Sequence, residues 1–181
     1  VWDLADRTHP VKQTTLKDHT SYVKAVAVTS DGRTAITGSY DKIAIVWDLA
    51  DRTRPVKQAT LKGHTSYVDA VAVTSGGRTA ITGSDDKIAI VWDLADRTRP
   101  VKLTTLKGHT GPVSAVAVTL DGRTAITGSH DETVIMWDLT DAAEIAARPL
   151  NAACAILDRE LSPEEWSRYA PGLDRLKVCG I

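Results

Sequence analysis

The sequence predicts an all-β protein built from repeated four-stranded antiparallel sheets. A Trp-Asp-Leu phrase recurs every 45 residues, at Trp2, Trp47, Trp92 and Trp137. Between these landmarks lie short apolar, β-branched segments, which are separated by Gly- and Asp-containing turns about every ten residues. A fixed period of this length is typical of an array of similar supersecondary units. The predicted units are residues 2–46, 47–91 and 92–136.

The second unit illustrates the strands expected in each repeat. Tyr67–Thr74, Thr79–Thr82 and Ile88–Trp92 are apolar on both faces, so we expect them to be covered on both sides. Pro100–Leu106 begins with proline and carries Lys and Thr, as suits an exposed edge strand. Units packed side by side around an axis meet both requirements. We therefore predict a partial β-propeller of about three four-stranded blades over residues 1–140.

Each unit also carries three short motifs in a constant order: a His that follows Gly in the second and third units, Gly-Ser-x-Asp, and Trp-Asp. With these motifs, residues 1–140 resemble the WD-repeat family. The resemblance implies that a His, a Ser or Thr, an Asp and the Trp of each blade form a buried, hydrogen-bonded tetrad. Carried over to this sequence, the tetrads are His19, Ser39, Asp41 and Trp47; His64, Ser84, Asp86 and Trp92; and His109, Ser129, Asp131 and Trp137.

One residue departs from the family pattern. Asp18 stands where the later units have Gly63 and Gly108 before the histidine. Asp tolerates a left-handed backbone better than most residues do. We therefore expect a weakened turn at Asp18 and an intact blade.

The repeated Ser, His and Asp could suggest hydrolysis, with His activating Ser. Three equivalent copies would then be three separate sites, and no nucleophile-elbow motif accompanies them. A structural role explains the same residues, because buried hydroxyl, imidazole, carboxylate and indole groups must find hydrogen-bond partners. The histidines stand 45 residues apart, without the close ligand pairs of a zinc site. We therefore predict no catalytic residue, no metal and no cofactor.

Positions at which the near-identical units differ are the best candidates for binding a partner. They fall just before the tetrad Asp, at the start of the innermost strand, and two residues before that start. In the WD-repeat family these positions face the top of the disc around the central channel. Neutral drift at exposed sites is the alternative explanation of the differences. The predicted partner-binding residues are Tyr22, Lys24, Tyr40, Tyr67, Asp69, Asp85, Pro112, Ser114 and His130.

Residues 141–181 have a different pattern, which predicts a short α-helical tail. Ser162-Pro163 followed by Glu165 is a helix start, and Trp166 and Tyr169 fall on one face of that helix. The stretch CAILDRELSPEEWSRYAPGL resembles the C-terminal end of actinobacterial WD-repeat proteins, many of which carry a STAND-class NTPase or a Ser/Thr kinase. We expect the tail to cover the open edge of the last blade; docking of a partner is the alternative.

Composition limits the possible partners. The 181 residues have a formal net charge of −1, so no bulk attraction to nucleic acid or anionic membranes is expected. No apolar run approaches the length of a membrane span, and no phosphate-binding loop occurs. The two cysteines are too few for a disulfide framework, which favours a reducing cytoplasm.

Taken together, the sequence predicts a non-catalytic scaffold for protein–protein contacts. Because the N-terminus shows no capping repeat, we expect this chain to be the C-terminal docking or sensing part of a larger bacterial signalling protein. The alternative is a partial propeller that self-assembles into a closed ring by exchanging outer strands. The expected partner of such a scaffold is a protein.

Overall fold

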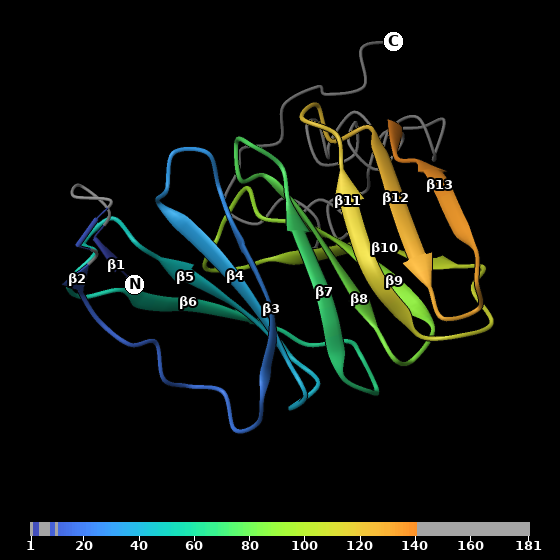
Figure 1. Cartoon of the computed structure of the whole chain (residues 1–181). Helices are drawn as coiled ribbons and strands as arrows, with labels where there is room; N and C mark the ends of the chain where they lie inside the picture. Colours follow the sequence, from blue (N-terminus) through green and yellow to red (C-terminus); the bar gives the residue numbers. More distant parts are fainter. Residues whose placement is uncertain (1, 4–7, 10, 141–181) are drawn as a thin grey trace, which may run out of the picture. The chain divides into compact units, whose positions relative to one another are not determined.

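The structure, a computed structural model, describes residues 2–3, 8–9 and 11–140, and its elements there are antiparallel β-strands (Figure 1). The first blade contains β3 (Val23–Val28), β4 (Thr34–Ser39), β5 (Ala44–Asp48) and β6 (Val56–Leu61). The second blade contains β7 (Val68–Val73), β8 (Thr79–Ser84), β9 (Ile88–Asp93) and β10 (Val101–Lys107). Both sheets pair in chain order, which confirms the predicted up-and-down topology.

The third blade contains β11 (Val113–Val118), β12 (Thr124–Ser129) and β13 (Val134–Asp138). A two-stranded sheet, β1 (Trp2–Asp3) with β2 (Val11–Lys12), precedes the first blade. The predicted all-β fold class is therefore confirmed. The predicted helical tail, residues 141–181, lies outside the described residues.

Local sequence explains where the inner strands turn. Gly32, Gly77 and Gly122 have φ of 66°, 68° and 72° in the turns between the first and second strands of the blades. Only glycine adopts this backbone region without steric penalty. In the second blade, the N–H of Gly77 donates to the carbonyl oxygen of Thr74 at 2.8 Å. The turn reverses the chain tightly, so Val73 at the end of β7 pairs with Ala80 near the start of β8.

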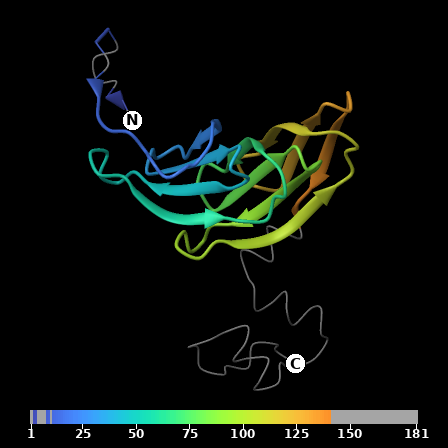
Figure 2. The ribbon, with the colours of Figure 1, turned by 90° about the horizontal axis from the view of Figure 1, so that it is seen from below.

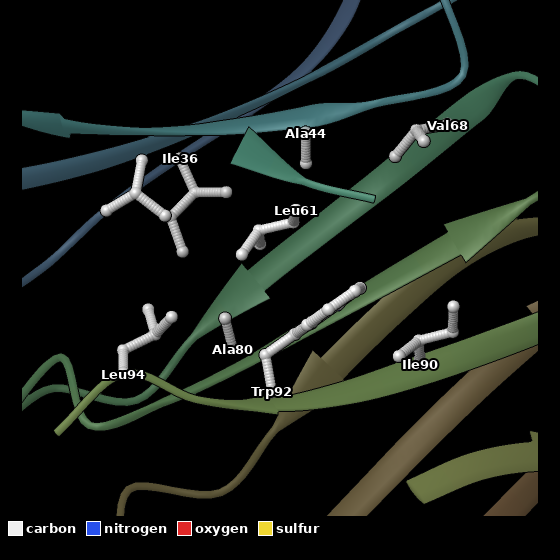
Figure 3. Close-up of a cluster of buried hydrophobic side chains, with 9 residues drawn as sticks. Ile36, Ala44, Leu61, Val68, Ala80, Ile90, Trp92 and Leu94 are labelled. Carbon is white, nitrogen blue, oxygen red and sulfur yellow. The ribbon is translucent and has the colours of Figure 1, made fainter. Parts of the chain in front are cut away.

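The blades pack face against face, and the innermost strands β3, β7 and β11 lie side by side (Figures 1 and 2). Between the first and second blades lies a cluster of buried apolar side chains (Figure 3). Ile36 and Val46 contribute to it from the first blade, and Val68, Ile90 and Trp92 from the second. In the second blade, both faces of β8 and β9 are thus covered, as their apolar composition requires.

The first outer strand is shorter than expected. The predicted outer strand Pro100–Leu106 has its equivalent at Pro10–Leu16, whereas β2 covers Val11–Lys12. Its partner β1 has two residues, so the ladder contains two residue pairs, Trp2 with Lys12 and Asp3 with Val11. The outer strands β6 and β10 run longer because β5 and β9 offer longer partners.

Candidate functional site

Each blade contains a hydrogen-bonded chain of four side chains, shown here for the second blade. The Nδ1–H of His64 donates to Asp86 Oδ2 at 2.9 Å, and that oxygen also accepts the backbone N–H of Thr65 at 2.8 Å. At the other side of the ring, His64 Nε2 lies 2.8 Å from Thr82 Oγ1. Trp92 Nε1–H donates to the same hydroxyl oxygen at 3.0 Å. The hydrogen bonds therefore link the four side chains in the order Asp, His, Thr and Trp.

The other two blades repeat this geometry. In the first, the separations Asp41–His19, His19–Thr37 and Thr37–Trp47 are 2.8, 2.7 and 2.9 Å. In the third, the corresponding separations among Asp131, His109, Thr127 and Trp137 are 2.9, 2.8 and 2.8 Å. The network therefore repeats with the sequence and is not specific to one blade.

The hydroxyl group in these tetrads is a threonine, and the predicted serines Ser39, Ser84 and Ser129 do not occupy that place. Trp92 pairs with Ala80 across the two strands, so Thr82 is its diagonal neighbour on the same face. Ser84 lies two residues further along, at the strand end, where its Oγ accepts the backbone N–H of Asp86 at 3.1 Å. The serines therefore shape the turn that carries the aspartate. Strand alternation places Thr82 and Ser84 on the same face, so the shorter separation from the Trp92–Ala80 pair is what selects Thr82.

The protonation of the tetrad follows from its partners. A carboxylate can only accept hydrogen bonds, so His64 carries its proton on Nδ1. The Thr82 hydroxyl oxygen accepts a hydrogen bond from Trp92, and its own O–H therefore donates a hydrogen bond to His64 Nε2. Burial lowers the pKa of His64 below its ordinary value, against the opposing attraction of Asp86. The ring is thus neutral at pH 7, with both nitrogens engaged.

Hydrogen bonds lower the pKa of the tetrad aspartates Asp41 and Asp131, which are held in the ionised form. Burial by itself would raise the pKa of Asp41, but the N–H of Thr20 and the ring of His19 lower it below its ordinary value. The Thr37 hydroxyl group that completes this tetrad is buried, with 5% of the residue exposed. A buried hydroxyl group that is hydrogen-bonded to both His and Trp is not placed to attack a substrate.

The glycine before each tetrad histidine has a different role from the one expected. Gly63 and Gly108 are not among the described positions with positive φ. A Cβ atom at Gly63 would lie 3.1 Å from Ile90 Cδ1 and 3.4 Å from the Trp92 ring. Close approach to the tryptophan, and not a left-handed turn, therefore explains the glycine. In the first unit, the Asp18 carboxylate reaches Lys57 Nζ at 3.6 Å instead.

The variable residues Lys24, Asp69 and Ser114 occupy equivalent β-bulges. In each inner strand the register shifts across this one residue, between Val23 and Ala25 in the first blade and at the same place in the others. A bulge takes a residue out of the ladder and redirects its side chain. These three residues therefore have no cross-strand partner, whereas their neighbours in the strand do.

The remaining predicted positions meet in pairs at the same end of each blade. The N–H groups of Tyr40, Asp85 and His130 donate to the carbonyl oxygens of Tyr22, Tyr67 and Pro112, at 3.0, 3.0 and 2.9 Å. We call the nine residues the rim: Tyr22, Lys24, Tyr40, Tyr67, Asp69, Asp85, Pro112, Ser114 and His130.

Three tyrosines of the rim form a continuous aromatic cluster across two blades. The rings of Tyr40 and Tyr67 stack with centroids 4.2 Å apart and planes 14° from parallel. Tyr22 meets Tyr40 edge-on, with centroids 6.0 Å apart. Tyr22 is 79% exposed and Tyr67 is 40% exposed. Large aromatic surface therefore remains accessible at the joint between the first and second blades.

Charged residues from all three blades act on one carboxyl group of the rim. Burial, together with the neighbouring Asp85, raises the pKa of Asp69 to about 6, against the opposing charges of Lys24 and His130. Asp69 Oδ2 is buried and has no hydrogen-bond partner. The rim thus brings together one acidic pair and flanking basic groups.

Within residues 2–3, 8–9 and 11–140, no group of three or more His, Cys, Asp or Glu side chains is placed to hold a metal ion. The same part of the chain contains no helix of the length and apolarity needed to cross a membrane.

Comparison with known families agrees with the geometry. The family model "WD domain, G-beta repeat" matches residues 10–48, 55–93 and 100–138. Each match runs from the start of an outer strand to the Trp-Asp pair of the next blade, and together the matches cover more than half of the chain. A search of curated proteins finds no match. The repeat, the blades and the family match lead to one conclusion: this chain belongs to the WD-repeat family.

Proposed function

We propose that the blades form a non-catalytic platform that binds a protein partner on the rim. The observation that carries this proposal is the aromatic cluster of Tyr22, Tyr40 and Tyr67, which joins two blades and leaves Tyr22 79% exposed. Tyrosine is enriched among residues that dominate the energetics of protein interfaces. Binding residues are also typically displayed at the loop ends of a rigid scaffold.

Two features favour binding over neutral drift. Three of the variable positions are bulge residues, and the tyrosines that differ between units stack on one another across a blade joint. Drift at independent exposed sites gives no reason for such contacts. The acidic pair Asp69 and Asp85 beside exposed tyrosines suits a partner segment that presents a basic side chain, through charge and cation–π attraction.

The wider setting is also a proposal. WD repeats generally mediate contacts between proteins, and residues 141–181 resemble the ends of actinobacterial WD-repeat signalling proteins. These resemblances support a docking or sensing role within a cytoplasmic bacterial signalling protein.

The test compares two triple variants of the full chain as baits, with quantitative mass spectrometry of the captured proteins. Replacing Tyr22, Lys24 and Tyr40 by alanine removes aromatic and basic groups of the rim. We expect this variant to capture at least tenfold less of the specific partner than the unaltered chain does. The control replaces Lys12, Lys57 and Lys102, which are exposed at equivalent places on the outer strands. Equal capture of the same proteins by both variants would refute the proposed rim.

A further inference from the structure

The first blade has an uncovered apolar face. Val23, Val26 and Val28, which we call the leading face, are 51%, 63% and 51% exposed. Their equivalents in the later blades lie against the preceding blade, and Val68 and Val113 are both 0% exposed. The same side chain in the same local sequence is therefore buried wherever a blade stands in front of it.

The complementary face of the third blade is not covered by any other residue that the structure describes. Ile126, Val134 and Met136 are 38%, 72% and 71% exposed. With Gly128 they form what we call the trailing face. Their equivalents in the second blade, Ile81, Ala89 and Val91, are 0%, 1% and 0% exposed, because the third blade covers them. An exposed apolar sheet face of this kind marks an interaction surface.

The two internal joints show how such faces fit together. A Cβ atom at Gly38 would lie 2.7 Å from Val68 Cγ1 and 3.1 Å from Val71 Cγ1. At Gly83 the corresponding distances, to the Cγ1 atoms of Val113 and Val116, are both 2.9 Å. Two valines of one blade thus fill the space left by a glycine of the preceding blade (Figure 3 shows Val68 at the first joint). At Gly128 the nearest atom is Ala115 Cβ at 3.5 Å, in the same blade.

We propose that a second copy of this chain docks its leading face on the trailing face, so that Val23 and Val26 of one copy cover Gly128 of the other. The occupant must present two valines at this spacing around a β-bulge, and the chain's own first blade does so. The contact is head to tail, so a pair of copies keeps one free leading face and one free trailing face until a ring closes. Two copies would supply six sets of inner strands, within the range of closed propellers.

The strand edges support the same arrangement. In the second blade, Lys102 of the outer strand pairs with Trp92. In the leading two-stranded sheet, Lys12 pairs with Trp2 in the equivalent register. β13 is the edge strand of the described third blade, and Trp137 occupies the same repeat position. A docked second copy would therefore offer β2 the equivalent strand β13, which would take the place of β1 as its partner.

Two residues make this joint differ from the internal ones. Val134 and Met136 replace the smaller Ala89 and Val91 of the second blade. Both are larger and would reach further toward the docked valines. Methionine is unbranched and fills irregular gaps, so Met136 can adapt to the second copy. Neither face includes a residue of the rim, so this proposal does not depend on the proposed function.

The experiment measures the mass of the full chain in solution by sedimentation velocity over a range of concentrations. We expect the unaltered chain to associate, and Val26→Glu and Met136→Glu each to weaken association at least tenfold. Val56→Glu is the matched control, because Val56 is 60% exposed on an outer strand. The equivalent Val101 stays 57% exposed although blades flank it on both sides, so this position is not part of a joint.

A mixture of the two variants tests the head-to-tail geometry. Val26→Glu retains a normal trailing face and Met136→Glu a normal leading face, so the mixture should form one intact joint and recover a 1:1 dimer. A monomeric unaltered chain would overturn the proposal. So would association of Met136→Glu by itself, since the valine face would then pair with itself or bind elsewhere. A mixture that stays monomeric would overturn it as well.

Discussion

At the scale of single residues, the threonine hydroxyl groups are the junctions of the tetrads. Thr82 Oγ1 accepts from the Trp92 indole and donates to the His64 ring. Thr82 is 0% exposed, so no water can replace it. Loss of this hydroxyl group would leave two buried polar groups without their hydrogen-bond partner. Each such group lowers the free energy of unfolding by about 1–3 kcal/mol.

We predict that Thr82→Val lowers the free energy of unfolding by about 2–3 kcal/mol, because the shape is kept and the hydroxyl group is lost. Ser84→Ala is the comparison, since Ser84 Oγ accepts one backbone N–H in the turn. It should be destabilising by about 1 kcal/mol. Urea denaturation of both variants gives the measurement. A larger effect at Ser84 would contradict the assignment of Thr82 to the tetrad.

The rim contains a residue whose ionisation opposes folding. The pKa of Asp69 is raised to about 6 by burial and by Asp85, above its ordinary value of 3.8. Between pH 4 and pH 6 the folded chain therefore holds a proton that the unfolded chain has released. The free energy of unfolding falls as pH rises through this window, and the loss is complete above it.

We predict that Asp69→Asn is more stable than the unaltered chain at pH 7, and that this difference vanishes at pH 4. The gain should be at most about 1 kcal/mol, because the carboxyl group is partly exposed and water screens the repulsion. Asp96→Asn is the control, since the Thr98 hydroxyl group lowers the pKa of Asp96 and no gain at pH 7 is expected. Urea denaturation at pH 4 and pH 7 measures the free energy of unfolding of each variant. An equal gain for Asp69→Asn at both pH values would argue against an ionisation effect.

At the scale of elements, the second strand of each blade ends in Thr-Gly-Ser, and the glycine lets the next blade approach. At Gly83 a Cβ atom would lie 2.9 Å from two valine methyl groups and 3.1 Å from the Val113 carbonyl oxygen. Backbone cannot move aside as a flexible side chain can. The strand therefore tolerates a weak β-former here because the joint requires it.

We predict opposite effects of one substitution at two equivalent glycines. Gly83→Ala should be destabilising by about 1–3 kcal/mol, because it overpacks the joint between the second and third blades. Gly128→Ala should be neutral or stabilising by up to about 1 kcal/mol, because its surroundings are open and glycine is entropically costly in a strand. Thermal unfolding of both variants at low protein concentration measures the difference. Equal destabilisation would show that the trailing face is already occupied within one chain.

At the scale of the whole molecule, the blades form an array in which each contacts its neighbours. Stability in such an array is close to a sum of blade terms and joint terms. The second blade has a joint on each side, and Ile81, Ile90 and Val91 are accordingly buried. Self-association, as proposed above, would add joints without adding new kinds of contact. The same near-identity of the units also permits strands to pair with the wrong unit during folding.

Much of the fold was predictable from the sequence because its causes are local. Turn glycines with positive φ, such as Gly77, and apolar strands between them recur every 45 residues. The up-and-down blades follow from that repetition. The positions at which the units differ could also be found by comparing them. The tetrad hydroxyl group was assigned to Ser84 instead of Thr82, because motif spacing does not show how far the Trp92 ring reaches along a neighbouring strand.

The sequence by itself thus determined the strands, the turns and the family. Only the tertiary structure decided which equivalent residues are covered. Val23 and Val68 follow the same Ser-Tyr dipeptide, yet one is 51% exposed and the other 0%. Tyr40 and Tyr67 stand 27 residues apart but stack at 4.2 Å. Burial and stacking depend on which blade stands alongside, and identical local sequences contain no information about their neighbours in space.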